Sequence, residues 1–463
     1  MWYRHEADSD GTLVKAEARI ILDGGAYDSS SNAVIANAAY FAFGPYKCDN
    51  TSVDAVAVRT NNPPAGAMRG FGGVQTAYAH EAQMDRLADE LGIDRLEVRR
   101  INALGHGDNM NTSGQLIEGS LPTAELIDEL AKMPLPDPVA STDPRHLPGG
   151  TGLTTEPGHV RRGVGYGVTL KNLAFSEAFD DYSDARISIS PIGVEVYTAA
   201  AEVGQGLVTV IQQLVRDVLK MENVAVIWSD TGVIGSAGST SASRQTQMTG
   251  GAAYFCAREL REQILAEYGG DDLSIEGVWL RGELIVTLDE ICALQPRQHE
   301  IRYRHPETFA TDENGQGDPH PAYAVAAHRA VVDVDPELGL VRVVQVDAVH
   351  DVGKLLNPVA ALGQIEGGTA QGVGLATLEE LVLEKGVIKN PNFTDYLLPT
   401  FLDAPHVEVK WVEEPERWGP LGAKGIGEPP TISAGPAVAA AIRDAIGRHL
   451  YRVPVLPQHI VGL

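Results

Sequence analysis

The sequence predicts an α+β fold, in which helices and antiparallel strands share a domain. A β-hairpin, a helix and a further strand follow one another between residues 187 and 228. A similar order of hairpin and helix recurs between residues 331 and 377. Because hairpins pair strands antiparallel and the helices lie between them in the chain, the two kinds of element are expected to pack together.

The N-terminal part begins with two predicted strands. Residues 12–23 and 51–59 alternate apolar and polar side chains, as half-buried strands do. Residues 24–42 between them are mostly small, and no element is assigned to them. The chain start lacks a turn or a cap before the first strand, so we expect it to fall within a domain.

Helices follow these strands. The apolar stripe after Gly73 predicts a helix that ends at Gly92. Asp94 can cap a second helix that continues to a stop at Gly105. A short third helix is predicted for residues 123–133.

A stretch rich in proline and glycine, residues 134–160, predicts the domain boundary. Its six prolines and the Gly149-Gly150 pair are incompatible with long regular structure. The sequence therefore predicts one domain over residues 1–133, a linker over 134–160, and a second domain over 161–463.

The second domain opens with the hairpin already mentioned, residues 187–198, whose turn is Pro191–Gly193. Residues 207–218 place apolar side chains on one helical face, and residues 224–228 read as a strand. In the later hairpin, residues 335–339 form the turn.

The composition is that of a folded protein with an acidic surface. The chain has 463 residues, of which 44% are hydrophobic and 21% charged, and its net charge is -26. This charge repels nucleic acid and anionic membranes, and no basic patch offsets it, so neither is expected as a partner.

The cysteines and the N-terminus predict a cytoplasmic protein. Cys48, Cys256 and Cys292 are too far apart for a CxxC unit, so we expect no zinc and no iron-sulfur cluster on this chain. Their scarcity suits a reducing cytoplasm. The first residues show neither a signal peptide nor a membrane span.

Five glycine-rich loops are candidate ligand sites, because glycine allows close backbone approach and N–H groups at helix starts attract oxyanions. Each loop alone is more often a plain turn or a helix cap. No dinucleotide fingerprint or Walker lysine loop is present, so NAD and ATP are not the expected ligands. The loops are Ala67–Gly73, Glu202–Gly206, Gly238–Arg244, Gly363–Gly368 and Gly422–Pro430.

Glu428 is the carboxylate with the most unusual surroundings. It follows a glycine and precedes Pro429-Pro430 and a predicted helix over residues 433–449. The stiff backbone could aim a catalytic base, or the carboxylate could simply favour a helix N-terminus; both interpretations remain open. Likewise, Arg69 could bind an oxyanion and Phe71 could stack on a planar ligand, or both could belong to an ordinary surface loop.

In their order along the chain, these segments resemble the molybdenum-binding catalytic subunit of the xanthine dehydrogenase and aldehyde oxidase family, from about residue 15 to the end. The similar segments are Ala67–Gly73 (Arg-Gly-Phe-Gly), Val203–Gly206 (Gly-Gln-Gly), Asp351–Gly353 with Leu356–Pro358 and Gly363–Gln364 (a late cofactor loop), and Gly425–Pro430 (the catalytic glutamate). The resemblance implies the family's molybdenum-cofactor-binding domains.

The same resemblance implies the roles of individual residues. Glu428 would act as the base that deprotonates a molybdenum-bound hydroxyl, while redox chemistry belongs to the cofactor. Phe71 would face the substrate, and Arg69 and Ala242 would lie beside the molybdenum without ligating it. The expected cofactor-binding residues are Arg69, Gly70, Gly204, Gln205, Gly206, Ala242, Ser243, Gln364, Lys424 and Gly425.

The implied cofactor is a molybdenum-pterin, either molybdopterin or its cytosine dinucleotide. The implied activity is hydroxylation, with water as the oxygen source, of an N-heterocycle such as xanthine or hypoxanthine in purine catabolism. An aldehyde or another heteroaromatic substrate is the alternative, because residues 32–38 lack the arginine that some purine-oxidising members have there. Iron-sulfur clusters and FAD would reside on partner subunits of a multi-subunit complex.

One part of the family pattern is missing from this sequence. The family's N-terminal hammerhead domain and its Gly-Gly-Gly-Phe-Gly loop are absent. We therefore expect a second polypeptide to supply that half, or the sequence to be part of a longer chain. A non-catalytic scaffold is the competing interpretation.

Overall fold

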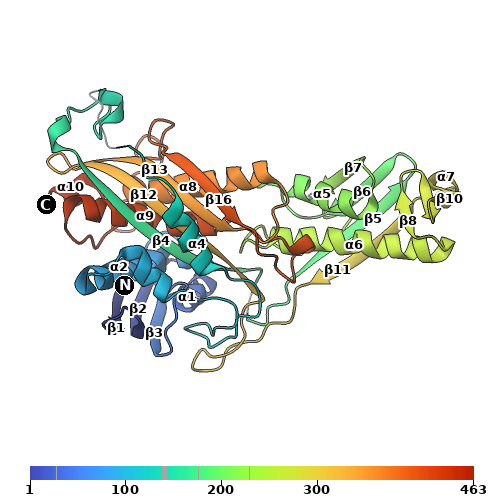
Figure 1. Cartoon of the computed structure of the whole chain (residues 1–463), viewed down its shortest axis with the longest axis horizontal. Helices are drawn as coiled ribbons and strands as arrows, with labels where there is room; N and C mark the ends of the chain where they lie inside the picture. Colours follow the sequence, from blue (N-terminus) through green and yellow to red (C-terminus); the bar gives the residue numbers. More distant parts are fainter. Residues whose placement is uncertain (28, 138–142, 176, 229, 463) are drawn as a thin grey trace.

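The α+β prediction is confirmed. A computed structural model describes residues 1–27, 29–137, 143–175, 177–228 and 230–462. Two four-stranded sheets lie towards opposite ends of an elongated molecule, and helices pack on both (Figure 1). In the described part of the chain, no helix combines the length and apolarity needed to cross a membrane.

The central sheet has the order β16-β13-β12-β4. Its neighbours are antiparallel except for β13 and β16, which run parallel. All 14 positions of β12 are buried, as expected for a strand covered on both faces. The strands are β4 (Arg161–Leu173), β12 (Ala322–Asp335), β13 (Leu340–Asp351) and β16 (His406–Val412), and the helices near them are α8 (Pro358–Thr377), α9 (Pro429–Ile446) and α10 (Pro457–Val461).

The N-terminal layer confirms the predicted strands and helices there. Asp94 accepts hydrogen bonds from the backbone N–H groups of Leu96 and Glu97 at 2.8 and 3.1 Å, so it caps its helix as predicted. That helix ends at Ile101, earlier than predicted. The elements are β1 (Trp2–Ala7), β2 (Leu13–Gly25), α1 (Ser31–Tyr40), β3 (Thr51–Arg59), α2 (Gly73–Leu91), α3 (Arg95–Ile101) and α4 (Thr123–Lys132).

The second sheet has the order β11-β5-β6-β7 and contains the predicted hairpin, β5 followed by β6. The longest helix, α6, was not predicted. The elements are β5 (Tyr182–Ser190), β6 (Gly193–Thr198), α5 (Leu207–Leu219), β7 (Val224–Trp228), α6 (Gln245–Tyr268) and β11 (Arg297–Arg304). The small elements that remain are β8 (Asp272–Ser274), β9 (Gly277–Leu280), β10 (Glu283–Thr287), α7 (Leu288–Ile291), β14 (Leu383–Glu384) and β15 (Val387–Ile388).

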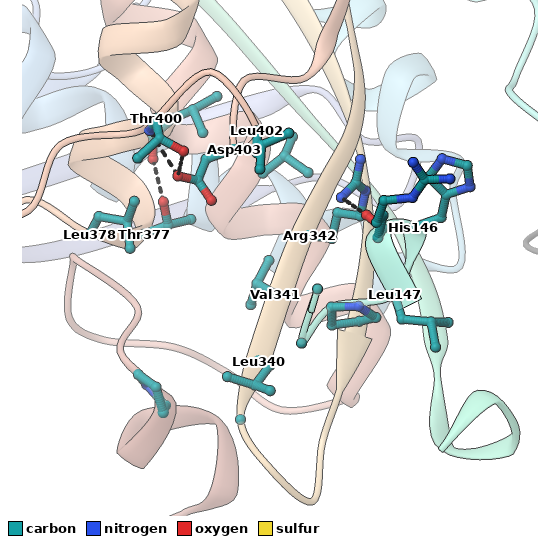
Figure 2. Close-up of a pocket in the computed structure, with 18 of the residues that line it drawn as sticks. His146, Leu147, Leu340, Val341, Arg342, Thr377, Leu378, Thr400, Leu402 and Asp403 are labelled. Atoms are coloured by element: carbon teal, nitrogen blue, oxygen red, sulfur yellow. Dashed lines mark hydrogen bonds between the residues drawn. The ribbon is translucent and has the colours of Figure 1, made fainter. Parts of the chain in front are cut away.

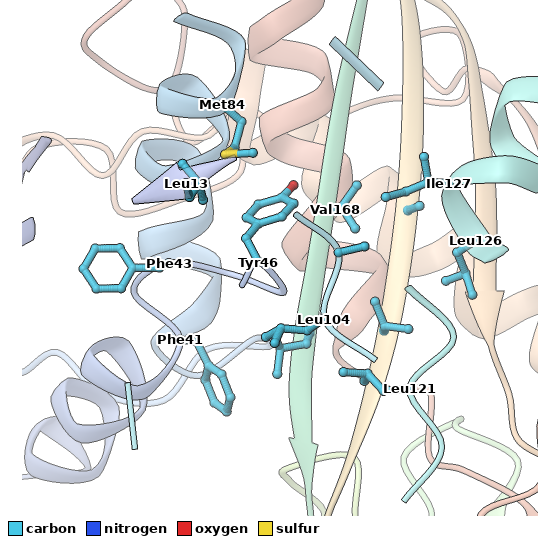
Figure 3. Close-up of a cluster of buried hydrophobic side chains, with 14 of the residues drawn as sticks. Leu13, Phe41, Phe43, Tyr46, Met84, Leu104, Leu121, Leu126, Ile127 and Val168 are labelled. Carbon is cyan, nitrogen blue, oxygen red and sulfur yellow. The ribbon is translucent and has the colours of Figure 1, made fainter. Parts of the chain in front are cut away.

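One apolar core joins the N-terminal layer to the central sheet. Leu13 and Met84 belong to the same buried cluster as Val168 of β4 and Ile127 of α4 (Figure 3). Residues 138–142 of the predicted linker lie outside the described residues, and 3-10 turns at Pro144–His146 and Pro157–His159 interrupt the rest. The division into two domains stays a prediction.

Three glycines on β4 let α9 approach the sheet closely. Gly163, Gly165 and Gly167 alternate along the strand and face α9. A Cβ atom on each would lie 2.0 to 2.3 Å from backbone atoms of that helix. Since α9 begins directly after Glu428, this contact also sets where Glu428 lies.

Five buried histidines should make the fold sensitive to acid. Burial lowers the pKa of His5 from 6.5 to about 4 and those of His80 and His328 to about 3. It lowers the pKa values of His320 and His350 well below 6.5. In each case the unfolded chain binds the proton more tightly, so stability is fully present above pH 6.5 and is lost as pH falls.

We expect the urea midpoint of unfolding to be lower at about pH 5 than at about pH 7 for this reason. The variant His5→Phe keeps an aromatic ring against Phe43, whose centroid lies 5.7 Å from that of His5, but it removes one titrating group. Its midpoint should depend less on pH than that of the parent protein. An equal dependence in both proteins would show that His5 does not contribute.

Candidate active site

All five glycine-rich loops meet around one cavity of about 500 Å³. They come from the N-terminal layer, from the second sheet and from the central sheet, so only the folded chain brings them together. Each loop contributes at least one residue to the wall of this cavity, and examples from the five loops in chain order are Met68, Val203, Thr240, Gln364 and Gly427. A cavity of this volume is of the size that holds a small molecule or cofactor.

Glu428 lies in this wall at the first turn of α9. Its side chain makes no capping hydrogen bond to its own helix, and Pro429 and Pro430 have no N–H to offer. Instead, Oε1 accepts a hydrogen bond from the backbone N–H of Gly70 at 3.1 Å. Oε2 is buried and has no hydrogen-bond partner in the described structure. A carboxylate that accepts a hydrogen bond at one oxygen and none at the other suits a proton acceptor better than a helix cap.

Arg69 ties three of the loops together. Its Nε donates to the carbonyl oxygen of Gly427, and its Nη2 donates to the carbonyl oxygen of Gln364 at 3.1 Å. Burial lowers the pKa of the guanidinium group, and the charge of Glu428 opposes that shift. Arg69 therefore lines the cavity, but its Nε and Nη2 groups already donate hydrogen bonds to the backbone of two other loops in the wall.

Phe71 also lines the cavity, on the loop that donates to Glu428. Its backbone has φ 39°, a left-handed conformation that is unusual for a residue other than glycine. This conformation lies between Gly70 and Gly72, which are also left-handed. The loop thus turns sharply enough to place a ring and a backbone N–H at the same cavity.

The loop at residues 202–206 is held by a carboxylate. Glu202 accepts hydrogen bonds from the N–H groups of Gly204 at 2.8 Å and Gly206 at 3.1 Å, and also from Val208 at 3.0 Å. Burial opposes ionisation, but these donors lower the pKa of Glu202. The backbone N–H groups of Gly204 and Gly206, which the sequence suggested as donors to an anion, therefore already donate to Glu202 within the loop.

Gln205 lies in the cavity wall, but its amide folds back on its own loop. Its Oε1 accepts from the N–H of Val203 at 2.6 Å, and its Nε2 donates to the carbonyl oxygen of Ala201 at 2.9 Å. Gln205 and Gln364 also line a smaller cavity of about 70 Å³. Gln364 thus borders both cavities.

The loop at residues 238–244 packs directly against the loop that carries Glu428. Ala242 and Ser243 have φ values of 53° and 46°. The hydroxyl of Ser243 accepts a hydrogen bond from the N–H of Glu428 at 2.9 Å. A Cβ atom on Gly425 would lie 1.7 Å from the carbonyl oxygen of Ser243, so this position requires glycine.

Lys424 forms a buried ion pair and does not line the Glu428 cavity. Its Nζ donates to Asp351 Oδ2 at 2.6 Å and to the carbonyl oxygen of Ser120 at 2.7 Å, and both side chains of the ion pair are fully buried. Burial raises the pKa of Asp351 to about 6, and Lys424 opposes the rise. The ammonium group therefore links the Asp351–Gly353 segment to the Glu428 loop, and contact with a cofactor through Lys424 stays a prediction.

The sequence reasoning missed Lys171, a buried lysine beside Glu428. Its Nζ lies 3.8 Å from Glu428 Oε2, and its side chain is fully buried. No motif marks this residue. A lysine within the otherwise largely apolar strand residues 164–173 was the available signal, because an unpaired lysine is rarely buried.

A larger cavity of about 650 Å³ lies elsewhere, between the start of β13, the end of α8 and residues 145–151. Figure 2 shows its wall, in which aliphatic side chains such as Leu340 and Val341 lie beside polar ones such as Arg342 and Asp403. None of the predicted site residues lines it. The cavity beside Glu428, although smaller, is the one that combines a buried carboxylate with the glycine-rich loops.

The walls of the Glu428 cavity fit a large polar cofactor. They carry the hydroxyl groups of Thr240, Ser241 and Ser243 and the amides of Gln205 and Gln364. Glycine at several wall positions allows close backbone approach. Glu428 is part of this wall, and its Oε2 accepts no hydrogen bond within the described structure. Sequence resemblance and geometry therefore point to the same place.

Comparison with known proteins gives a consistent result. Models of the molybdopterin cofactor-binding domain match residues 1–103 and 152–405. The chain is 29% identical to the xanthine dehydrogenase molybdenum-binding subunit of Escherichia coli O157:H7, covering 98% of this chain and 61% of that protein. It is 30% identical to the 6-hydroxypseudooxynicotine dehydrogenase complex subunit gamma of Paenarthrobacter nicotinovorans, covering 98% of this chain and 58% of that protein.

Among solved structures, the aldehyde oxidoreductase of Desulfovibrio desulfuricans matches with a TM-score of 0.85 and 25% identity, over 99% of this chain and 48% of that one. The chain thus spans about 60% of the length of these curated relatives and about half of this solved chain. The match extends over both sheets and the loops between them. The chain belongs to the molybdopterin-binding family of xanthine dehydrogenase and aldehyde oxidoreductase molybdenum-binding subunits.

Proposed function

We propose that this chain forms the base-carrying side of the active site in a molybdenum hydroxylase, an oxidoreductase that adds oxygen from water to an electron-poor carbon. The observation that carries the proposal is Glu428, which lines the cavity where the five loops meet and whose buried Oε2 accepts no hydrogen bond. The bound molybdenum-pterin group supplies the redox chemistry.

Proton transfer, substrate stacking and cofactor binding are assigned to different residues of this chain. Glu428 accepts a proton at Oε2, while the N–H of Gly70 steadies Oε1. The ring of Phe71 stacks on a planar substrate. Cofactor binding would fall to the loops that line the cavity and carry Arg69, Gly204 to Gly206, Ala242, Ser243, Gln364 and Gly425, and the resemblance implies that Arg69 and Ala242 would lie near the metal. Lys424 supports the last of these loops from behind.

An N-heterocycle such as xanthine or hypoxanthine is the proposed substrate class, in agreement with the name of the Escherichia coli relative. An aldehyde is the second candidate, favoured by the solved aldehyde oxidoreductase structure. Helix α1 contains no arginine, so a cation from this helix is not available to orient a purine. A screen of purines, aldehydes and other heteroaromatics with the intact complex separates the candidates.

We infer that the electron path continues outside these 463 residues. The three cysteines of this chain are fewer than the four ligands that an iron-sulfur cluster usually takes. We propose that iron-sulfur and FAD subunits accept the electrons in the cytoplasm, and that the segment corresponding to the remainder of the longer relatives, on a second polypeptide or on the same longer chain, closes the site. The name of the Paenarthrobacter relative, which includes the word complex, supports the first part of this proposal.

Metal and pterin analysis tests the function directly. We expect the protein purified with its natural partners to contain molybdenum and a pterin. A preparation that turns over one of the screened substrates but lacks both would overturn the proposal. A complex that holds neither and has no activity would support the scaffold interpretation instead.

A further inference from the structure

Lys171 lies at the end of β4, inside the protein, where an ammonium group is costly to bury. Its Nζ donates hydrogen bonds to Asn37 Oδ1 at 3.1 Å and to Asn172 Oδ1. The rings of Phe41 and Phe71 lie 5.1 and 6.0 Å away and face the cation. These contacts fix the amine from three elements of the fold.

The position of the amine relative to Glu428 is specific. Two of the three ammonium hydrogens are used in the hydrogen bonds to Asn37 and Asn172. Nζ lies 3.8 Å from Glu428 Oε2. That oxygen is the one without a hydrogen-bond partner. At this separation the attraction between the two charges is strong in a buried site, although no hydrogen bond forms.

Other charged and titratable groups near the pair do not replace this contact. Arg69 acts on Glu428 through its charge, but its guanidinium nitrogens bond to the carbonyl oxygens of Gly427 and Gln364. His320 lies close enough to Lys171 for the ammonium charge to lower its pKa further, and burial keeps this imidazole neutral. Burial also lowers the pKa of Lys171, and Glu428 opposes that shift.

We propose that Lys171 is a positioning residue for Glu428, which fixes the Oε2 end of the carboxylate while the N–H of Gly70 fixes Oε1. The carboxylate is thereby held at both ends in one orientation, and Oε2 stays free of any hydrogen bond that would have to break before it takes a proton. The inference rests on the proposed role of Glu428 as base. It concerns only residues of this chain, and the attraction between the two side chains can be measured without turnover.

The first test is a double-mutant cycle on unfolding. Lys171→Met, Glu428→Gln and the double variant are compared with the parent protein by urea denaturation of the complex as purified. If the charges attract each other, the double variant loses less stability than the two single losses added together. Additive losses would contradict the proposed contact, because Lys171 would then serve only its asparagine partners.

The second test is kinetic. Lys171→Met should lower kcat by about tenfold or more with little change in KM, because a misaimed base affects the reaction more than substrate binding. Lys171→Arg, which restores a cation, should recover part of the loss. Retention of kcat within about twofold in Lys171→Met would overturn the proposal. If Lys171→Met does not fold, Lys171→Gln takes its place in both tests.

The two tests separate this inference from the proposed function. If no substrate is turned over and no molybdenum is found, the function fails, but the unfolding cycle still reports whether Lys171 and Glu428 are coupled. If the parent enzyme is active and the cycle is additive, the positioning role fails while the function stands. If the parent complex contains molybdenum and pterin, Lys171→Met should contain the same amounts, because Lys171 is not proposed to bind the cofactor.

Discussion

Glu428→Gln should lower kcat by about a thousandfold while the cofactor stays bound, since general base catalysis contributes on this order. Glutamine has nearly the same shape, and its carbonyl oxygen can still accept the hydrogen bond from the N–H of Gly70. The change therefore removes the proton acceptor, together with the charge that attracts Lys171. Steady-state kinetics of the intact complex, combined with molybdenum and pterin analysis of each preparation, measures both parts of the expectation.

Glu90→Gln is the matched control for this substitution. Glu90 is exposed near the end of α2 and does not line the Glu428 cavity. Its replacement should leave kcat unchanged. Turnover by Glu428→Gln within about tenfold of the parent would show that another group takes the proton. Loss of molybdenum from the variant would instead assign Glu428 a part in holding the cofactor.

Gly165→Ala should destabilise the fold by about 3 kcal/mol or more, as overpacking of a rigid contact does. The added Cβ would lie 2.2 Å from the backbone nitrogen of Ala441 and 2.4 Å from the carbonyl oxygen of Ala437. Both are backbone atoms of α9, so no side chain can rotate away. Relief requires that the helix moves off the sheet, and this movement would also displace Glu428. Urea unfolding and kcat should therefore both change.

Gly158→Ala provides the same chemical change at a position where it should be harmless. A Cβ atom there has no heavy atom within 4 Å, and the backbone is not left-handed. We expect its unfolding midpoint to match that of the parent closely. If Gly165→Ala were equally harmless, the close approach of β4 and α9 would not be needed for stability.

Local sequence signals predicted much of the secondary structure. Alternation identified β2 and β3, and Gly92 ended α2 in the left-handed conformation that its lack of a side chain allows. The helix after Glu428 was predicted to start at Ser433 but begins at Pro429, because proline is well suited to the first turn of a helix. Helix α1 was missed, since its small residues show no apolar stripe.

The sequence predicted which loops could form the candidate site but not the contacts made within it. Their glycine content identified the five loops, the resemblance assigned roles to residues in them, and the cavity contains at least one residue from each loop. The hydrogen-bond and ion-pair partners of residues in these loops could not be predicted from the spacing of residues in the sequence. Glu202 uses the N–H groups of its loop, and Lys424 is paired with Asp351, because each contact joins groups whose distance depends on the fold.

The sequence by itself determined that the chain is α+β, which loops are rich in glycine, and that Glu428 stands between a glycine and two prolines. These properties depend on near neighbours in the chain. The tertiary structure decided that Glu428 contacts Gly70, 358 positions away, and that Lys171 lies 3.8 Å from its other oxygen. Such contacts depend on how β4 and α9 pack against each other. That packing joins segments that are far apart in the sequence and whose backbones approach closely, so a local sequence pattern does not predict it.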